Sequence, residues 1–321
     1  MVIGYFLSTE EYTPAELLEQ AVLAEQAGFE ALTISDHFHP WNDEQGQSGF
    51  VWSLIGAISQ ATDLPVMTAV TCPTTRISPV ITAQAAATSA VLLDGRFRLG
   101  VGSGEALNEH IHGEAWPSAG VRLERLEEAI EVMRLLWSGK TVNHRGRHYT
   151  VENARIYTLP ERPPEVYVSG FGPKATDLAA RVGDGYVTTS ADADALAAFK
   201  EKSGGRPAAC TFKAAFAPSE EEGVGHAHRL WSTSGLPGEL AQVLPTPSHF
   251  EQGALLVTEE MTRQSMVCGP DIDRHIEAFG DYAGFDEVYV ANIGPHYAEM
   301  IRRFGAEVLP AVREARGQAR G

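Results

Sequence analysis

Short apolar runs rich in β-forming residues alternate with longer helical patterns along nearly the whole chain, and this alternation constrains the fold most. The first unit shows the pattern. Residues 2–8 are typical of a strand, Thr13 and Glu16 form a capping box that starts a helix, and Gly28 suits the position after a helix end. A second strand over residues 31–35 then completes a βαβ unit.

Eight runs have the strand pattern, and most of them are followed promptly by a helix. The strands are predicted at 2–8, 31–35, 66–71, 97–102, 166–169, 185–189, 210–216 and 288–291. Further helices are predicted at 53–61, 80–92, 119–137 and 174–182, with a closing helix at 297–313 and a small hairpin at 144–149 that turns at Arg145 and Gly146. Eight such units favour a closed (β/α)8 TIM barrel, a fold that commonly takes about 250 residues and tolerates insertions.

The length of 321 residues exceeds what the barrel needs. The surplus is predicted at 218–268, where prolines such as Pro237 and Pro245 separate polar helical stretches. We therefore expect one barrel domain over residues 1–321, with an insertion after the seventh strand that covers the barrel mouth.

A Rossmann fold is the competing architecture. Residues 170–175 (GFGPKA) match the pattern GxGxxG/A between a predicted strand and a predicted helix. This match is short and lies in the middle of the chain. The four βα units that precede it have no place in a Rossmann fold that starts there.

Charge and cysteine content exclude several classes of protein. The chain has 25 Lys and Arg against 42 Asp and Glu, a net charge of -17, so its surface repels nucleic acid and anionic membranes. Its three cysteines are odd in number and show no CxxC spacing, which is typical of a protein in a reducing cytosol. No apolar run approaches the roughly 20 residues of a membrane helix. We expect a cytoplasmic protein with a small-molecule ligand.

In a TIM barrel the active site lies at the carboxyl ends of the strands. The second strand ends in SDHFHPW, where Asp36 and His37 place a carboxylate beside an imidazole and Trp41 supplies a flat apolar wall. An imidazole exchanges protons near neutral pH and suits general acid or base work. The alternative is a structural role for all three residues, in loop capping and packing.

The fourth strand leads into GVGSGEALNE, residues 100–109. Glycines at alternate positions let the backbone turn tightly or let a ligand approach. Glu105 follows directly, either as a general acid or as a carboxylate favoured at a helix N-terminus.

Two later strand ends fit an anionic ligand. Residues 169–173 (SGFGP) lead into a helix whose free N–H groups can bind an anion. The cluster 188–190 (TTS) offers hydroxyl groups, although such residues also cap helices.

His110 and His112 resemble a metal pair, but no third ligand follows at a suitable spacing. We therefore expect no metal.

Four motifs in this order and spacing resemble the luciferase-like flavin and deazaflavin barrel superfamily. They are ISDHFHPW, LGVGSGEALNE, YVSGFGP and GDGYVTTS. Within the superfamily they look like the group around the coenzyme F420-dependent glucose-6-phosphate dehydrogenases. The resemblance spans nearly the whole chain and is weakest over 218–268. It implies a homodimeric (β/α)8 barrel that binds coenzyme F420, an 8-hydroxy-5-deazaflavin.

The resemblance also implies residue roles. His37 matches the base that removes the substrate's hydroxyl proton, Trp41 matches the wall beside the reacting carbon, Glu105 matches the acid facing the deazaflavin, and Glu10 matches a residue lining the pocket. Ala69 and Val70 match a cis peptide that supports the ring. The other cofactor-binding matches, including those in the glycine loops that the tail crosses, are Asp36, Ser103, Gly104, Asn108, Ser169, Gly170, Phe171, Gly172 and Thr189.

The substrate is where this sequence departs from that group, which binds phosphate with two lysines and an arginine. The first lysine's position is Asp192 here, and the arginine's position falls near Gln264, beside Arg263. A carboxylate in place of a cation repels phosphate. We expect an alcohol, sugar-like or natural-product substrate. The alternatives are a genuine glucose-6-phosphate dehydrogenase, a flavin mononucleotide (FMN) monooxygenase, and a barrel that only binds a ligand.

Overall fold

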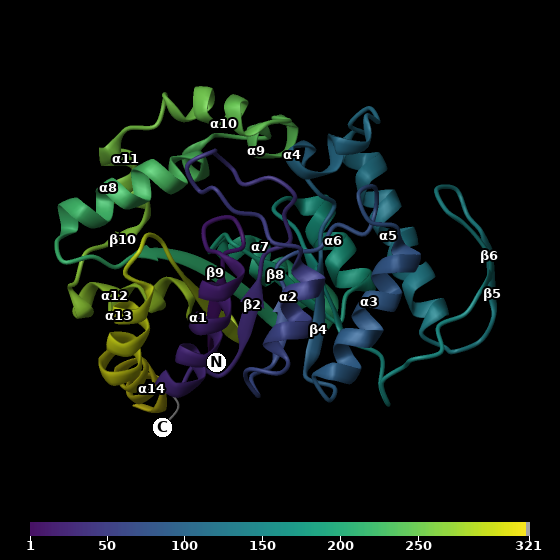
Figure 1. Ribbon diagram of the computed structural model, residues 1–321, viewed down its shortest axis with the longest axis horizontal. Coiled ribbons are helices and arrows are strands. Elements are labelled where there is room, and N and C mark those ends of the chain that lie inside the picture. Colours follow the sequence, from purple (N-terminus) through teal and green to yellow (C-terminus); the bar gives the residue numbers. More distant parts are fainter. Residues whose placement is uncertain (319–321) are drawn as a thin grey trace.

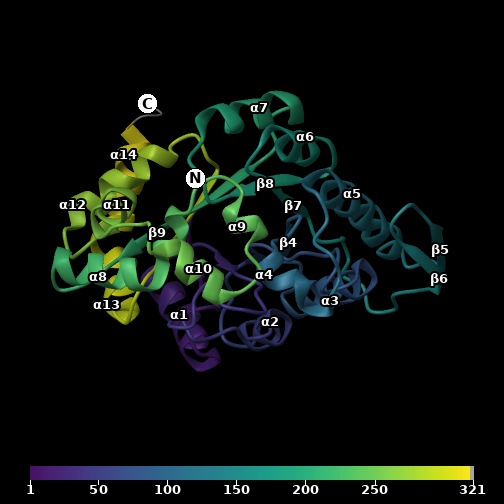
Figure 2. The same cartoon turned by 90° about the horizontal axis from the view of Figure 1, so that it is seen from above.

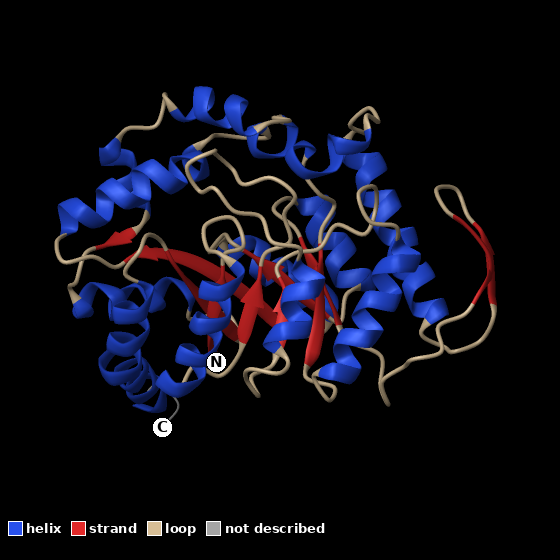
Figure 3. Cartoon of the chain, in the orientation of Figure 1, coloured by secondary structure: helices blue, strands red, loops and turns tan. Residues whose placement is uncertain are grey.

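The computed structural model describes residues 1–318, and its centre is a ring of parallel strands surrounded by helices (Figure 1, Figure 3). The strands of the ring are β1 (Val2–Leu7), β2 (Leu32–Ile34), β3 (Val66–Thr68), β4 (Phe97–Val101), β7 (Val166–Ser169), β8 (Gly185–Thr188), β9 (Ala208–Ala215) and β11 (Glu287–Asn292). They are hydrogen-bonded in the order β9-β11-β1-β2-β3-β4-β7-β8, and β8 pairs with β9. The predicted closed (β/α)8 barrel is confirmed.

Most helices around the ring begin and end close to the predicted positions, but the two at residues 193–203 and 272–278 were not predicted. The helices are α1 (Pro14–Ala27), α2 (Val51–Ile58), α3 (Pro79–Leu92), α5 (Ala119–Leu136), α6 (Pro173–Val182), α7 (Ala193–Ser203), α12 (Ile272–Ala278), α13 (Tyr297–Arg303) and α14 (Leu309–Gln318). The capping box of Thr13 and Glu16 is present, and Gly28 ends α1 in the left-handed conformation. No helix within residues 1–318 is long and apolar enough to cross a membrane.

Four details differ from the sequence prediction. Helix α2 begins and ends earlier than predicted, and the closing helix is divided by a π-helical turn at Phe304–Val308. The hairpin strands β5 (Val142–Arg145) and β6 (Thr150–Ala154) place the turn after Arg145. A further strand, β10 (Val267–Cys268), pairs with β9. Its two residues are too few to show a periodic pattern.

Large side chains fill the inside of the ring, so the barrel is a packed core. Tyr167 and Tyr289 are its largest members, with exposed fractions of 2% and 0%. The aromatic ring of each tyrosine lies against a glycine. A Cβ on Gly4 would lie 2.3 Å from the ring of Tyr289, and a Cβ on Gly185 would lie 2.5 Å from the ring of Tyr167. These two glycines make room for the tyrosines.

The segment between β9 and β10 forms four helices, α8 (Glu220–Trp231), α9 (Leu240–Val243), α10 (Pro247–Ala254) and α11 (Glu259–Ser265). They lie on the side of the ring where the strands end, and in the view from above α9 lies over the middle of the ring (Figure 2). Asn42 and Gln45 both donate to the carbonyl of Leu230 at 2.9 Å, which ties the loop after β2 to α8.

Candidate active site

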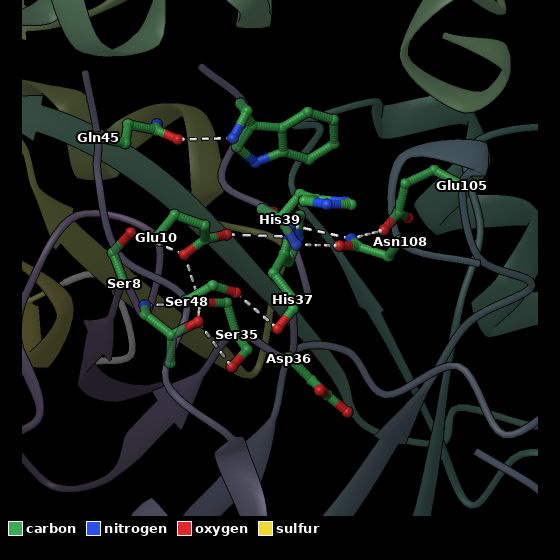
Figure 4. A network of polar contacts seen from close by, with 12 residues as sticks. Ser8, Glu10, Ser35, Asp36, His37, His39, Gln45, Ser48, Glu105 and Asn108 are labelled. Atoms are coloured by element: carbon green, nitrogen blue, oxygen red, sulfur yellow. Dashed lines mark hydrogen bonds and ion pairs between the residues drawn. The ribbon is translucent and has the colours of Figure 1, made fainter. Parts of the chain in front are cut away.

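A line of polar side chains crosses the carboxyl ends of β1, β2 and β4 (Figure 4). Glu10 Oε1 lies 3.3 Å from His37 Nε2, and His37 Nδ1 lies 3.0 Å from Asn108 Nδ2. Asn108 Nδ2 also donates to Glu105 Oε1. Four residues from three separate strand ends thus form one connected line, with an imidazole between two carboxylates.

Glu10 is held in place by hydroxyl groups. Its Oε2 accepts hydrogen bonds from Ser35 Oγ at 2.6 Å and Ser8 Oγ at 3.0 Å, and the residue is only 2% exposed. Its other carboxylate oxygen remains for His37. A carboxylate in this position can accept a hydrogen bond from the imidazole.

Asn108 has a fixed orientation, because its Oδ1 accepts the backbone N–H groups of Phe38 at 2.7 Å and His39 at 2.9 Å. Its amide nitrogen must therefore face His37 and Glu105 and can only donate there. The carbonyl of His39, which can only accept, lies 3.1 Å from the same Nδ1 of His37. Asn108 can donate to Nδ1 when that atom carries no proton, and the carbonyl of His39 can accept from Nδ1 when it does. The site therefore accommodates His37 with or without a proton on Nδ1.

Trp41 is positioned by residues from the segment after β9. Its ring lies 5.0 Å from the ring of His37 and makes an edge contact with Phe250 of α10 at 5.1 Å. Its backbone N–H donates to Gln45. The indole thus forms a wall beside the imidazole, and that wall depends on α10.

Asp36 points away from the polar line (Figure 4). One of its oxygens lies 2.7 Å from the guanidinium of Arg76, and the other accepts from Thr71 Oγ1 at 2.7 Å. The backbone N–H of Arg76 donates to Glu109. Burial raises the pKa of Glu109 to about 7, against the opposing effect of Arg76. Both oxygens of Asp36 have partners within the protein. The side chain therefore links the loop after β2 to Thr71 and Arg76.

The opposite wall of the site is formed by the ends of β3 and β4. The Ala69–Val70 peptide is cis, in agreement with the resemblance. A Cβ on Gly102 would lie 2.8 Å from Val70, and Gly104 has a φ of +78° with Cys72 against it. Ala69, Val70, Ser103, Gly104 and Glu105 are all partly exposed here. Backbone and small side chains therefore form a surface against which a flat ring can lie.

The glycine loop after β7 leads into a helix N-terminus that has no side-chain cap. Gly172 is the N-cap of α6 and provides no side-chain cap, and Phe171 beside it is 58% exposed. The carbonyl of Gly170 accepts from Tyr186, which fixes the loop, while Ser169 is partly exposed and Thr189 is exposed. A helix N-terminus of this kind can bind an anionic group.

The residues at the positions of the related group's phosphate-binding cations do not gather into one cation-lined pocket. Asp192 is exposed and caps α7, accepting from the N–H groups of Asp194 and Ala195 at 3.0 Å. Arg263 on α11 pairs with Glu220 at 3.0 Å, and Gln264 donates to Glu260. Arg263, the cation beside the expected arginine position, is thus paired with carboxylates.

The sequence analysis missed Arg76 and also two residues near Glu10, Lys213 and Glu11. Lys213 of β9 lies over the ring of Trp231, with its Nζ 4.4 Å from the centroid. Burial lowers the pKa of Lys213, and the charge of Glu10 opposes this shift. Glu11 accepts from Trp231 Nε1 at 2.8 Å and from the N–H of Gly294. Lys213 could have been found as a charged residue within an otherwise apolar strand, whereas no sequence signal marks Glu11.

Comparisons with known proteins find relatives over nearly the whole chain. The model of the luciferase-like monooxygenase family matches residues 1–286. An F420-dependent glucose-6-phosphate dehydrogenase of Microbacterium testaceum is 33% identical over 97% of each chain, and one of Mycobacterium tuberculosis is 32% identical over 97% of this chain and 98% of its own. A solved F420-dependent secondary alcohol dehydrogenase in complex with an F420-acetone adduct is 33% identical, with a TM-score of 0.90 over 97% of this chain and 98% of its own.

Proposed function

The chain belongs to the luciferase-like monooxygenase family, and from this membership we propose that it is an oxidoreductase that uses coenzyme F420. It transfers a hydride between an alcohol-type substrate and the deazaflavin. The observation that carries the proposal is the line Glu10, His37, Asn108 and Glu105 beside Trp41, in a chain one third identical to F420-dependent dehydrogenases.

The residues present fit this cofactor. The wall formed by the cis Ala69–Val70 peptide and Gly102 suits a flat ring system, and a side chain at Gly102 would collide with Val70. The uncapped N-terminus of α6 at Gly172 suits the cofactor's tail, since its N–H groups bind anions without a cationic surface. When bound, coenzyme F420 supplies a carrier of two electrons as one hydride.

His37 is the base in this proposal. As the hydride leaves the carbinol carbon, the imidazole takes the proton of the hydroxyl group, and a carbonyl product forms. Glu10 stabilises the resulting imidazolium from 3.3 Å. Asn108 holds the ring of His37 in place, and Trp41 limits the space beside the reacting carbon.

Glu105 lies on the cofactor side of the site. Its carboxylate is tied to Asn108 and is partly exposed at the rim of β4, where it can exchange a proton with a ligand or with water. Asn108 connects Glu105 to His37, so the two proton-handling groups sit at fixed positions on either side of it.

The substrate that the site supports best is a neutral alcohol. Asp192 places a carboxylate where related dehydrogenases are expected to have a lysine, and Arg263 is paired with Glu220. A sugar phosphate would meet repulsion at Asp192, whereas a neutral alcohol would not. The solved relative that holds an F420-acetone adduct supports the same substrate class.

Glucose 6-phosphate is the second candidate substrate, because the relatives in Microbacterium and Mycobacterium are named F420-dependent glucose-6-phosphate dehydrogenases. The same fold also serves FMN-dependent enzymes.

Mixing the purified protein with F420 or FMN shows which of the two cofactors it binds. Tight F420 binding without FMN binding supports the proposal, FMN binding alone supports a monooxygenase, and no binding of either supports a ligand-binding barrel.

A comparison of substrates then tests the neutral-alcohol proposal. Deazaflavin reduction is followed with secondary alcohols and with glucose 6-phosphate. The matched variant is Asp192→Asn, which removes the negative charge while an asparagine still caps α7. We expect kcat/KM for glucose 6-phosphate to be low and to rise in the variant, with the neutral alcohol unchanged. Efficient oxidation of glucose 6-phosphate by the unaltered protein, inhibited by sulfate, contradicts the proposal.

The proposal includes a covered barrel mouth, a homodimer and a cytoplasmic location. Trp41 packs on Phe250 of the 218–268 segment, which supports its role as a cover. Phe50 and Ile81 are each 55% exposed near the starts of α2 and α3, which supports a second copy packing there. All three cysteines are free and buried, as suits a reducing compartment. Sedimentation equilibrium tests the dimer.

A further inference from the structure

A second polar cluster lies outside the proposed active site, where the 218–268 segment meets the last βα loop of the barrel. Glu222 and His226 stand one turn apart on α8, and His296 directly precedes α13. Glu222 Oε1 lies 2.9 Å from His296 Nε2 and 3.5 Å from His226 Nε2. One carboxylate oxygen and two imidazole nitrogens therefore converge from two separate elements.

These distances suit a metal ion. The three potential ligand atoms lie within 4.8 Å of one another. Zinc bonds of about 2.0–2.2 Å to nitrogen and oxygen in a tetrahedron place neighbouring ligand atoms roughly 3.3 Å apart. The two contacts of Glu222 straddle that value, so small rotations of the side chains would bring all three atoms to bonding distance.

The state of His226 gives independent support. Its Nε2 is shut off from water and makes no good hydrogen bond, since the carboxylate oxygen of Glu222 that it faces lies 3.5 Å away. The ring packs on Gly294, where a Cβ would lie 3.1 Å from it, and Gly294 is held by Glu11. A buried polar atom without a partner costs free energy unless a ligand satisfies it.

The surroundings oppose binding at only one point. Arg229 lies 3.4 Å from His226 Nδ1 and also pairs with Glu44. A metal on Nε2 requires the proton of His226 to be on Nδ1, so the contact with Arg229 must open. The pairing with Glu44 provides another place for the guanidinium.

We propose that Glu222, His226 and His296 bind a divalent transition-metal ion of the zinc class, with water completing the coordination. Imidazole nitrogen and carboxylate oxygen are ligands that this class accepts. The ion would join α8 to the loop before α13. The metal would thus fasten the segment that positions Trp41 to the barrel, and it takes no part in hydride transfer.

The test is a titration of chelator-treated protein with Zn²⁺, followed by calorimetry, and with Co²⁺, followed by its visible absorption. We expect one ion per chain at micromolar concentration and a rise in Tm with Zn²⁺. His226→Ala and His296→Ala should each weaken binding about 100-fold or more, beyond the usual effect of losing a second-shell contact. Hydrogen exchange should slow in 220–231 and 294–297 when the metal binds.

His228→Ala is the matched control, because His228 lies on the same helix and contacts Thr262 instead of the cluster. It should bind Zn²⁺ as the unaltered protein does. Glu222→Gln and His296→Ala change partly exposed residues and keep the test valid if His226→Ala folds poorly. Binding that needs millimolar Zn²⁺, or binding that His296→Ala and His228→Ala weaken equally, would overturn the proposal.

Discussion

The two ends of the barrel interior each hold a cluster of charged and hydroxyl groups, and they differ in how completely these groups are paired. At the amino end, Arg98 pairs with Glu287 and donates to Tyr167 at 3.2 Å and Tyr289 at 2.9 Å. Tyr289 in turn donates to Glu287 at 2.5 Å. Both tyrosine hydroxyl groups and the guanidinium thus meet an acceptor within the cluster.

This pairing fixes the charges of the amino-end cluster. Burial acts to raise the pKa of Glu287, but its hydrogen bonds and the charge of Arg98 outweigh that effect and hold the pKa below its ordinary value. Glu287 therefore stays ionised, and Arg98 stays charged. A saturated pair of this kind closes the barrel and is not available for proton exchange.

The carboxyl-end line is paired differently. His37 Nδ1 lies between a group that can only donate, on Asn108, and the carbonyl of His39, which can only accept. No single protonation state satisfies both contacts. The comparison teaches that an incompletely matched cluster at the carboxyl end leaves room for chemistry, whereas the matched cluster at the amino end provides stability, as is usual for TIM barrels.

Replacing His37 tests the catalytic half of this comparison and should have the largest effect. In His37→Ala, F420 binding should persist while turnover at saturating substrate falls by about 10²- to 10⁴-fold, the usual contribution of a general base. Steady-state kinetics and F420 fluorescence titration measure the two quantities. His110→Ala, a change on the nearby 3₁₀ turn, is the control and should retain activity. An undiminished rate in His37→Ala removes His37 from the mechanism.

Replacing Glu287 tests the structural half. Glu287→Gln leaves the guanidinium of Arg98 without its buried counter-charge, which costs about 3–5 kcal/mol of stability. Urea denaturation should show this loss, while kcat per folded molecule stays close to that of the unaltered protein. A variant that keeps its stability but loses turnover would reverse the roles assigned to the two ends.

Glu105→Gln is expected to act only at the carboxyl end, with a smaller effect than His37→Ala. The amide keeps the size of the side chain but loses the exchangeable carboxyl proton, so turnover should fall by about 10²-fold. Stability in urea should change little, since Glu105 is partly exposed. If F420 binding collapses while the rate per bound cofactor is kept, Glu105 is a structural ligand and not an acid.

The barrel was predictable because each strand and helix carries its own local signal. Thr13, Glu16 and Gly28 mark the limits of α1 within one residue of the structure. The two-residue strand β10 and the π-helical turn at Phe304–Val308 have no such signal, because both are set by neighbouring elements. The strand pattern predicted eight barrel strands, and the ring closes with those eight.

The candidate site was predictable only in its parts. The motifs around His37 and Glu105 point to chemistry, but the sequence does not show that Asn108 joins them or that Glu10 faces His37. Arg76 escaped notice because it acts through Asp36, 40 residues earlier in the chain. Contacts between distant strand ends depend on the closed ring, and no local pattern encodes them.

Glu11 offers the finest test, because it lies next to Glu10 but has a structural environment. Burial raises its pKa to about 7, although hydrogen bonds from Trp231 and Gly294 oppose the shift. Between about pH 4.5 and 7 the folded chain therefore holds a proton here that the unfolded chain has released. By linkage, this contribution to stability is complete below pH 4.5 and is lost as the pH rises through 7.

Glu11→Gln keeps an acceptor for Trp231 and Gly294 but does not titrate. The free energy of unfolding should then fall less between pH 5 and 7.5 than in the unaltered protein, by at most about 3 kcal/mol. Part of the slope should remain, since burial also raises the pKa of Glu109 to about 7. Urea denaturation at each pH measures the slope, and Glu161→Gln in an exposed loop is the control. An identical slope in Glu11→Gln and the unaltered protein would mean that Glu11 is ionised in the folded chain, and that the carboxyl end is as fully paired around it as the amino end is around Glu287.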